Sequence, residues 1–180
     1  MHLPTLGSLH VEPALTRTDL LAEQVRAALS GWPHAAEVGV AEIDPALADT
    51  TACAQAYAVP LEAGANCVVV AGKRDGEERV AACLVRSDTR ADVNNRVKRL
   101  LDVRKCSFLS MDRAVAESGM EYGGITPIGL PGHWRLFVDA RVLDLEVALI
   151  GSGVRRSKLL TPGHLFSELP SAEVIEGLAG

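Results

Sequence analysis

The chain has 180 residues, of which 48% are hydrophobic, so it can bury the core of one domain, or of one domain with a short N-terminal extension. Its formal charge of −5 at pH 7 argues against general electrostatic attraction to nucleic acid and leaves only local basic patches for contact with a polyanion. The longest apolar runs are only a few residues, so we expect no membrane span, and the N-terminus lacks the basic-then-apolar pattern of a signal peptide.

The first third of the chain is expected to form two helices and a strand. Apolar residues at helical spacing predict a first helix that Thr16 or Thr18 caps and that ends near Gly31. A short strand is expected over residues 38–43. A proline then favours the start of a second, alanine-rich helix over residues 45–57.

The clearest local signal is that of a β-hairpin. Two apolar runs flank the dipeptide Asp75-Gly76, which is a strong signal for a two-residue turn. With such a turn Cys67 lies opposite Leu84, so Cys67 and Cys83 face opposite sides of the sheet. We therefore expect no disulfide between them.

The rest of the chain mixes short helices and strands. The expected elements are a helix over 92–101, a strand over 107–109, a helix over 111–117, a loop over 122–131, strands over 136–140 and 147–150, and a last helix over 162–169. Irregular alternation with a hairpin favours an α+β fold with a mixed, curved, barrel-like β-sheet surrounded by helices. We expect an N-terminal helix and strand (1–45) packed on a main domain (46–170), followed by a C-terminal tail (171–180).

The loop over residues 122–131 is rich in glycine and proline. Three glycines and two prolines exclude a helix or a central strand. Glycines such as Gly123 and Gly124 let backbone N–H groups approach a ligand, so the loop is either a backbone-built binding site or an ordinary connector.

Basic residues gather in two segments of this acidic chain. One lies over residues 86–105, and the other, Arg155-Arg156-Ser157-Lys158, follows Gly151-Ser152-Gly153. Either cluster can contact phosphate groups or can simply be a solvated surface.

The four cysteines, at positions 53, 67, 83 and 106, show no C-x-x-C spacing, and no histidine stands at a ligand-like interval from them. We therefore expect no metal site. Free thiols without a signal sequence favour a reducing, cytoplasmic location.

Residues 46–169 resemble the YbaK/EbsC family, the free-standing relatives of the editing domain inserted in bacterial prolyl-tRNA synthetases. The resemblance rests on ordered features: Ala58-Val59-Pro60 before a strand over 67–71, the G-x-x-x-P pattern within residues 123–129, a strand with Asp139, and residues 151–155 before the last helix.

This resemblance implies metal-independent hydrolysis of the ester between a wrong amino acid and the 3′ end of a tRNA, often tRNA-Pro, without a cofactor. In such enzymes the glycine loop holds the terminal adenosine and the ester, and the substrate's 2′-hydroxyl helps to activate water. The implied partner is aminoacyl-tRNA, with transient contact to a synthetase and with neither DNA nor a membrane.

The resemblance also assigns the candidate residues. They are, for catalysis, Asn66, Gly123 and Gly124; for substrate binding, Thr126, Pro127, Gly129, Asp139, Gly151, Ser152 and Gly153; and for tRNA binding, Arg96, Lys98, Arg99, Arg155 and Arg156. We expect Asn66 and the loop to wall one pocket, and we expect Gly124→Ala to abolish function with little loss of thermal stability.

Two departures from the family pattern keep other functions open. Asn66 stands where family members usually carry a lysine, so it offers hydrogen bonds but no charge. After the late glycine motif, Gly151-Ser152-Gly153, basic residues occupy the stretch in which the synthetase-inserted domain carries a histidine. The alternatives are an inactive relative that binds a tRNA 3′ end, an aminoacyl nucleotide or a protein partner, and a thiol enzyme that uses Cys67.

Overall fold

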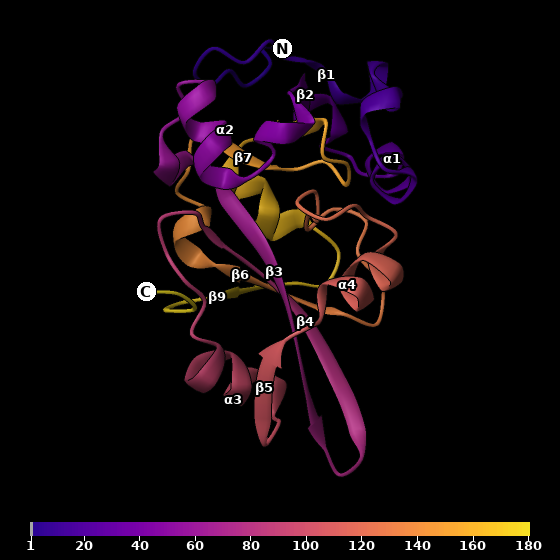
Figure 1. Cartoon of the computed structure of the whole chain (residues 1–180), viewed down its shortest axis with the longest axis vertical. Coiled ribbons are helices and arrows are strands. Elements are labelled where there is room, and N and C mark those ends of the chain that lie inside the picture. Colours follow the sequence, from indigo (N-terminus) through magenta and orange to yellow (C-terminus); the bar gives the residue numbers. More distant parts are fainter. Residues whose placement is uncertain (1) are drawn as a thin grey trace.

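The computed structural model describes residues 2–180, so Met1, at the start of the expected segment 1–45, lies outside the described residues. The fold is of the α+β class, as predicted, but its strands form two sheets rather than one (Figure 1). An isolated parallel bridge between Gly64 and Leu149 connects the two sheets. No helix within residues 2–180 is both long and apolar enough to cross a membrane.

The first sheet is antiparallel throughout. Its strand order is β1-β2-β8-β7, with β1 at Glu12–Pro13, β2 at Gly39–Glu42, β7 at Ala148–Gly151 and β8 at Ser157–Thr161. Because β2 pairs with β8, the N-terminal residues are part of this sheet and do not merely pack on it.

The second sheet is mixed. Its strand order is β5-β3-β4-β6-β9, with β3 at Ala65–Arg74, β4 at Glu77–Arg86, β5 at Lys105–Phe108, β6 at Arg135–Asp139 and β9 at Ala172–Ile175. β9 pairs in parallel with β6, so residues 172–175, within the segment 171–180 that we expected to be a C-terminal tail, belong to the sheet.

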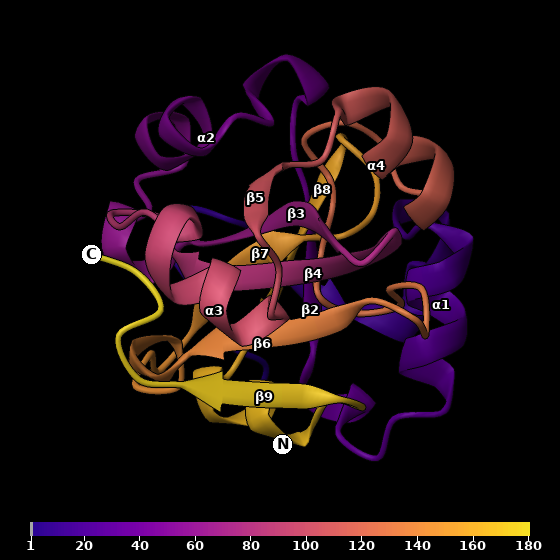
Figure 2. The same ribbon diagram turned by 90° about the horizontal axis from the view of Figure 1, so that it is seen from below.

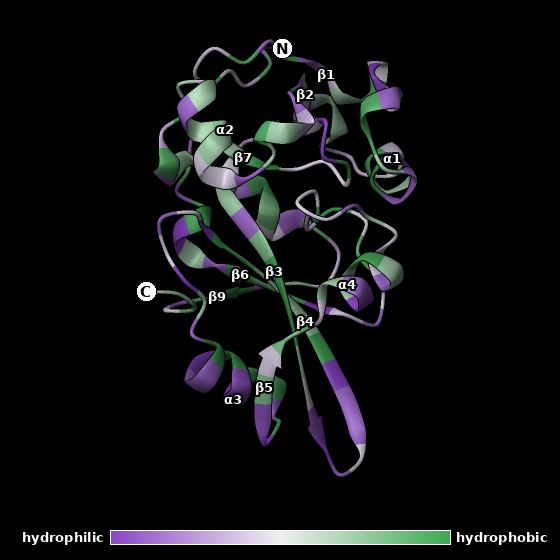
Figure 3. Ribbon diagram, viewed as in Figure 1, coloured by the Kyte–Doolittle hydropathy of each residue, from purple (hydrophilic) through white to green (hydrophobic). Residues whose placement is uncertain are grey.

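The β3–β4 hairpin confirms the predicted register. Arg74 pairs with Glu77 across a turn in which Asp75 and Gly76 both have positive φ, as a two-residue type I′ turn requires. Cys67 pairs with Leu84, and all four cysteines are free thiols. Figure 3 shows that the protruding tip of the hairpin is hydrophilic and that apolar residues follow nearer its base.

Except for the helix at Met111–Ser118, which covers the expected 111–117 and one residue more, the α-helices are shorter than the sequence patterns suggest. They are α1 at Glu23–Ser30, α2 at Thr50–Ala56, α3 at Lys98–Leu101 and α4 at Met111–Ser118, and Figure 2 shows them around the sheets. A π-helical turn over Val93–Val97 precedes α3, and 3-10 helices replace the expected helical residues at Pro45–Leu47 and Gly163–Glu168.

The first helix also begins later than expected. Neither Thr16 nor Thr18 caps it; both lie in 3-10 turns, and Ala22 occupies the N-cap position of α1. Leu20 and Leu21 are both buried. In an α-helix the side chains of adjacent residues point about 100° apart, so one helix face does not bury two neighbours equally. The chain buries both Leu20 and Leu21 by turning before the helix starts.

Two cores lie on opposite faces of the second sheet. The larger core joins the two sheets and α1, and includes Val40, Leu84, Val138 and Leu159. The smaller core lies beneath α3 and contains Phe137. A third buried cluster packs α2 against the outer face of the first sheet and contributes the inner wall of the cavity described next.

Candidate functional site

A cavity of about 260 Å³ lies where α2, the start of β3 and the ends of β7 and β8 meet. It is slightly smaller than the roughly 300–1,000 Å³ of typical small-molecule pockets. Its wall contains Ala48, Asp49, Thr50, Cys53, Ala54, Val59, Pro60, Leu61, Gly64, Ala65, Asn66, Cys67, Val68, Ser87, Met111, Tyr122, Gly123, Ile125, Leu149, Ile150, Gly151 and Lys158. Three predicted site residues, Asn66, Gly123 and Gly151, therefore share one cavity.

Asn66 is held in one orientation by α2. Its Oδ1 accepts a hydrogen bond of 2.9 Å from the Thr50 hydroxyl. This contact leaves the Asn66 amide N–H groups as its remaining donors, and the side chain is only half-buried. Asn66 can therefore donate to a ligand in the cavity, although it carries no charge.

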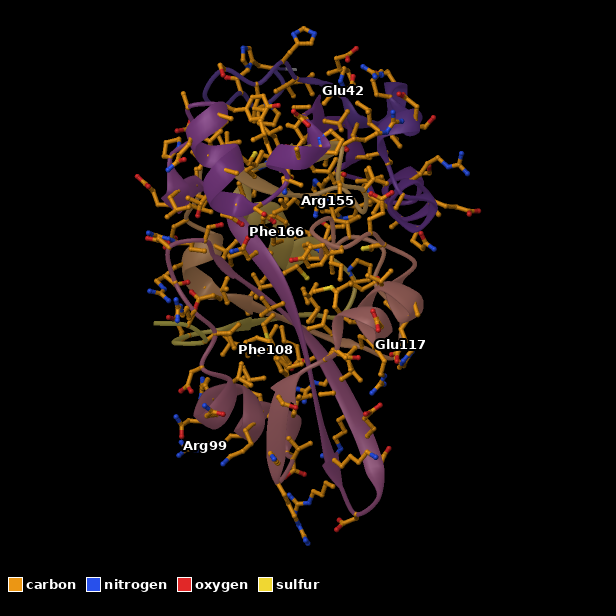
Figure 4. All side chains as sticks on the ribbon, viewed as in Figure 1. Glu42, Arg99, Phe108, Glu117, Arg155 and Phe166 are labelled. Carbon is orange, nitrogen blue, oxygen red and sulfur yellow. The ribbon has the colours of Figure 1, made fainter. Side chains whose placement is uncertain are left out.

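Gly123 and Tyr122 bring the glycine-proline loop to the same cavity. Gly123 has φ +77°, a conformation that favours glycine, and within residues 2–180 its N–H donates to no other group. The guanidinium of Arg155 donates to the carbonyls of Tyr122 and Pro45, at 3.1 Å each, and lies 5.4 Å from the centre of the Tyr122 ring. Arg155 thus fastens the loop to the turn before α2 (Figure 4).

Gly124 has a packing role that the sequence did not reveal. Its N–H already donates to the carbonyl of Glu121 at 2.9 Å, and its carbonyl accepts from Gly153 at 2.7 Å, so its N–H is not free to hold a ligand. A Cβ atom at position 124 would lie 2.8–2.9 Å from the backbone of Val154. The expectation that Gly124→Ala spares thermal stability is therefore wrong, because fixed backbone fills the space.

The late glycine motif forms the other side of this close contact. A Cβ atom on Gly151 would lie 2.5 Å from the carbonyl oxygen of Gly124. Ser152 and Gly153 do not line the cavity: both are buried, and Ser152 exchanges hydrogen bonds with the neighbouring Ser157. These two residues shape the β7–β8 connection.

The later part of the loop points away from the cavity. Thr126 is fully buried, and its hydroxyl has no hydrogen-bond partner within residues 2–180. Pro127 and Gly129 line a separate, mostly apolar cavity of about 240 Å³ beside Trp32 and Trp134. The structure therefore does not bring these three predicted substrate-binding residues to Asn66.

Asp139 also lies elsewhere, at the end of β6. Its side chain is 1% exposed and accepts hydrogen bonds from Arg141 and from the backbone N–H of Ala179. Desolvation alone would raise the pKa of Asp139, but these hydrogen bonds outweigh it and hold that pKa below its ordinary value. Asp139 thus attaches the C-terminal segment to the sheet.

The predicted tRNA-binding residues fall into two separate groups. Arg96 lies in the π-helical turn before α3, and Lys98 and Arg99 lie in α3, at the end of the molecule opposite β1 and β2, whereas Arg155 lies beside the cavity (Figure 4). Arg156 is exposed and donates to the carbonyl of Asp19. Of these five residues, Arg155 is the one that contacts a residue of the cavity wall, Tyr122, and contact of any of the five with tRNA stays a prediction.

The thiols of the cavity wall are not activated. Burial among apolar groups raises the pKa of Cys67 to about 12, and it raises the pKa of Cys53 as well. Both are protonated near neutral pH, which argues against a thiol nucleophile. Within residues 2–180 no cluster of three His, Cys, Asp or Glu side chains is placed to hold a metal ion.

Sequence reasoning missed Lys158 as a cavity residue. Lys158 is 9% exposed, lines the cavity and donates a 2.8 Å hydrogen bond to the carbonyl of Ala48. Its strand, β8, was not predicted. Reading residues 157–161 as a strand would have revealed a lysine within an otherwise uncharged run, on the same face as Leu160.

Comparisons with known proteins agree with this architecture. The chain aligns with the crystal structure of a candidate trans-editing enzyme for prolyl tRNA synthetase with a TM-score of 0.71 and 20% identity, over 86% of this chain and 94% of that one. It aligns with the hypothetical protein APE2540 with a TM-score of 0.75 and 19% identity, over 88% of this chain and all of that one. At these identities the likeness concerns the fold. A comparison with curated proteins finds no match.

The family comparison covers most of the chain and includes the cavity. The model of the aminoacyl-tRNA editing domain matches residues 44–166, a range that contains α2, the β3–β4 hairpin, the glycine-proline loop, β7 and β8. Since this match spans more than half of its length, the chain belongs to the aminoacyl-tRNA editing domain family.

Proposed function

We propose that this protein hydrolyses the ester bond of a mischarged aminoacyl-tRNA in trans, releasing the amino acid. The observation that carries the proposal is the cavity that joins Asn66, Gly123 and Gly151 inside the family-matched region. Within it, the Asn66 amide and the Gly123 N–H are donors without an acceptor in residues 2–180. Fixed donors of this kind can hold an ester carbonyl and stabilise the charge that develops on it.

The reaction needs only water as co-reactant. The water oxygen bonds to the carbonyl carbon, and the bond from that carbon to the ribose oxygen breaks. One water proton passes to the ribose oxygen, and the other is lost to solvent when the amino acid leaves as a carboxylate. The two thiols in the wall are protonated, and we propose that the ribose hydroxyl next to the ester assists the water, as the resemblance to the editing family implies.

The size of the cavity supports a small substrate end. A volume of about 260 Å³ fits an aminoacyl group and part of a ribose better than a whole acceptor stem, which would stay outside. The walls near β3 and β7 are largely apolar, with Val59, Val68 and Ile150 among them. Apolar walls of this kind discriminate between amino acids by about 1–3 kcal/mol per methylene group. We therefore propose that the cavity selects small amino acids by the size of their side chains.

We further propose tRNA-Pro as the first tRNA to test, since one structural neighbour is described as a candidate trans-editing enzyme for prolyl tRNA synthetase. Arg155, which contacts Tyr122 of the cavity wall, is proposed to meet the acceptor end together with the exposed Arg156 that follows it in the sequence. The proposal also implies a reducing compartment in which tRNA is charged, in keeping with four free thiols.

The test is a panel of mischarged tRNAs, including alanyl-tRNA-Pro, in which release of the labelled amino acid is followed against the uncatalysed rate. Asn66→Ala should lower the rate by about 2- to 13-fold for each neutral hydrogen bond lost, which corresponds to about 0.5–1.5 kcal/mol. Gly132→Ala is a control just after the loop, where no atom lies within 4 Å of the added methyl.

A second candidate function is binding of a tRNA end without cleavage, and the same assay distinguishes it from hydrolysis. Asn66 places an uncharged amide in the cavity, and such a site can bind a tRNA end without cleaving it. Retention of tRNA without release of amino acid from any member of the panel would favour this binding function over hydrolysis.

A further inference from the structure

Lys158 differs from every other lysine of the chain in its environment. The chain has four lysines; Lys73 and Lys105 are exposed, Lys98 is half-buried, and Lys158 is buried. On β8, Leu160 belongs to the buried cluster beneath α2 that also contains Cys53. Because side chains two residues apart on a strand share a face, Lys158 reaches the same side and ends in the cavity wall.

The ammonium group of Lys158 is only partly satisfied by the protein. Its single hydrogen bond within residues 2–180 goes to the carbonyl of Ala48 at 2.8 Å, and no carboxylate there lies within salt-bridge distance. An ammonium has three N–H donors, so two remain for water or a ligand. A buried charge with donors to spare is costly unless something in the cavity compensates it.

The surroundings of Lys158 define its electrostatic setting. The groups that act on it are Cys53 and Asp49 from α2 and its N-terminus, and Arg155 from the β7–β8 connection. Burial lowers the pKa of Lys158 from its ordinary value of 10.5, the nearby Arg155 lowers it further, and Asp49 opposes this.

We propose that Lys158 is a catalytic residue of this site, and that its ammonium group binds the carbonyl oxygen of the aminoacyl ester and stabilises the negative charge that forms there when water attacks. This inference rests on the proposed function and adds to it a cation from β8, whereas Asn66 on β3 supplies only neutral donors.

The ester carbonyl fits Lys158 better than the other polar groups of the substrate. The phosphates of a tRNA are large and strongly hydrated, and a side chain that is 9% exposed at the inner wall is poorly placed to meet them. The α-amino group of the amino acid is itself largely cationic near neutral pH and would be repelled. The carbonyl oxygen is the group that gains negative charge in the reaction.

The experiment compares Lys158→Gln with the wild type on a mischarged tRNA from the panel. Glutamine keeps a donor for the Ala48 carbonyl but removes the charge. We expect kcat to fall by about 10- to 150-fold, the range for a hydrogen bond to a charged group, with KM changed less than threefold. Lys73→Gln makes the same chemical change on the exposed hairpin and should leave both constants unaltered.

The pH profile separates a catalytic role from a structural one. The catalysed rate of the wild type, corrected for spontaneous hydrolysis, should fall as pH rises through the pKa of Lys158, because only the ammonium form is active. Lys158→Gln should lack this alkaline fall. A residue that only supports the fold would lower the unfolding midpoint and leave the shape of the profile unchanged.

The remaining outcomes refute either the role of Lys158 or the proposed function. If the wild type acts and Lys158→Gln matches it within threefold, or loses activity only in proportion to unfolded protein, the assignment of Lys158 is wrong and the deacylase proposal stands. If Lys158→Gln does not fold, Lys158→Met and the wild-type profile decide, and a profile without the alkaline fall refutes the assignment. If the wild type cleaves no tRNA, the proposed function fails and the role of Lys158 fails with it.

Discussion

Gly124→Ala should destabilise the protein by steric conflict in the backbone. A methyl group at position 124 would lie 2.8 Å from the nitrogen of Val154 and 2.9 Å from its carbonyl carbon and oxygen. Gly124 does not have a positive φ, so the cost comes from overlap and not from an unfavourable backbone angle. The opposing atoms cannot rotate away, because the Gly153 N–H holds the two segments together at 2.7 Å.

The size of the effect follows from this geometry. Overpacking costs about 1–3 kcal/mol, and contact with fixed backbone on three atoms places Gly124→Ala in the upper half, at about 2–3 kcal/mol. For a domain of this length, that corresponds to a fall in Tm of about 4–12 °C. The same contact aligns Gly123 with the cavity, so activity should fall together with stability.

The measurement is urea unfolding at pH 7 of Gly124→Ala beside Gly132→Ala. Both changes lower the conformational entropy of the unfolded chain equally, which corresponds to a stabilisation of about 0.4–1 kcal/mol. The difference between the free energies of unfolding of the two variants therefore isolates the steric clash. Gly132 has no atom within 4 Å of an added methyl and no positive φ. If the free energies of unfolding of the two variants agree within about 0.5 kcal/mol, the close approach of the two loops is wrong.

Three further predictions concern single side chains. Cys67→Ala should retain the catalytic rate, because the pKa of about 12 keeps the thiol protonated. For the same reason, iodoacetamide should alkylate Cys67 much more slowly in the folded protein than in urea. An inactive Cys67→Ala variant would favour the thiol mechanism instead. The folded pKa of Asp139 lies below the unfolded 3.8, so its contribution to stability is present above pH 3.8 and is lost as pH falls through the folded pKa. Asp139→Asn should therefore flatten that part of the stability profile measured by urea unfolding, and an unchanged acid slope would contradict the pairing. Thr50→Val should lower the rate of amino acid release as much as Asn66→Ala does, since it removes the hydroxyl that orients the amide; full activity would show that this orientation is unimportant.

Local sequence signals predicted the hairpin down to its register. The Asp75-Gly76 turn constrains two residues to positive φ, and this local geometry then determines every pair along β3 and β4, including Cys67 with Leu84. The family was recognisable for a similar reason, since the order of short motifs along the chain does not depend on how they pack.

The late strands were beyond local reasoning. β8 carries Lys158 in a run that has no strand alternation, and β9 is a short segment that pairs with β6 only after the chain has crossed the fold. Strand pairing forms backbone hydrogen bonds between segments that are far apart in the sequence. The local sequence of neither segment therefore indicates which strand it pairs with.

The sequence alone therefore determined the family, the hairpin and the presence of a glycine-proline loop near Asn66. The tertiary structure decided which loop residues meet the cavity: Gly123 does, whereas Gly124 fills a backbone contact and Thr126 is buried. It also brought Lys158 of β8, which lies 92 residues after Asn66 in the sequence, to the wall of the same cavity. The physical reason is that motifs report local conformation, whereas burial and free hydrogen-bond donors depend on which distant segments pack together.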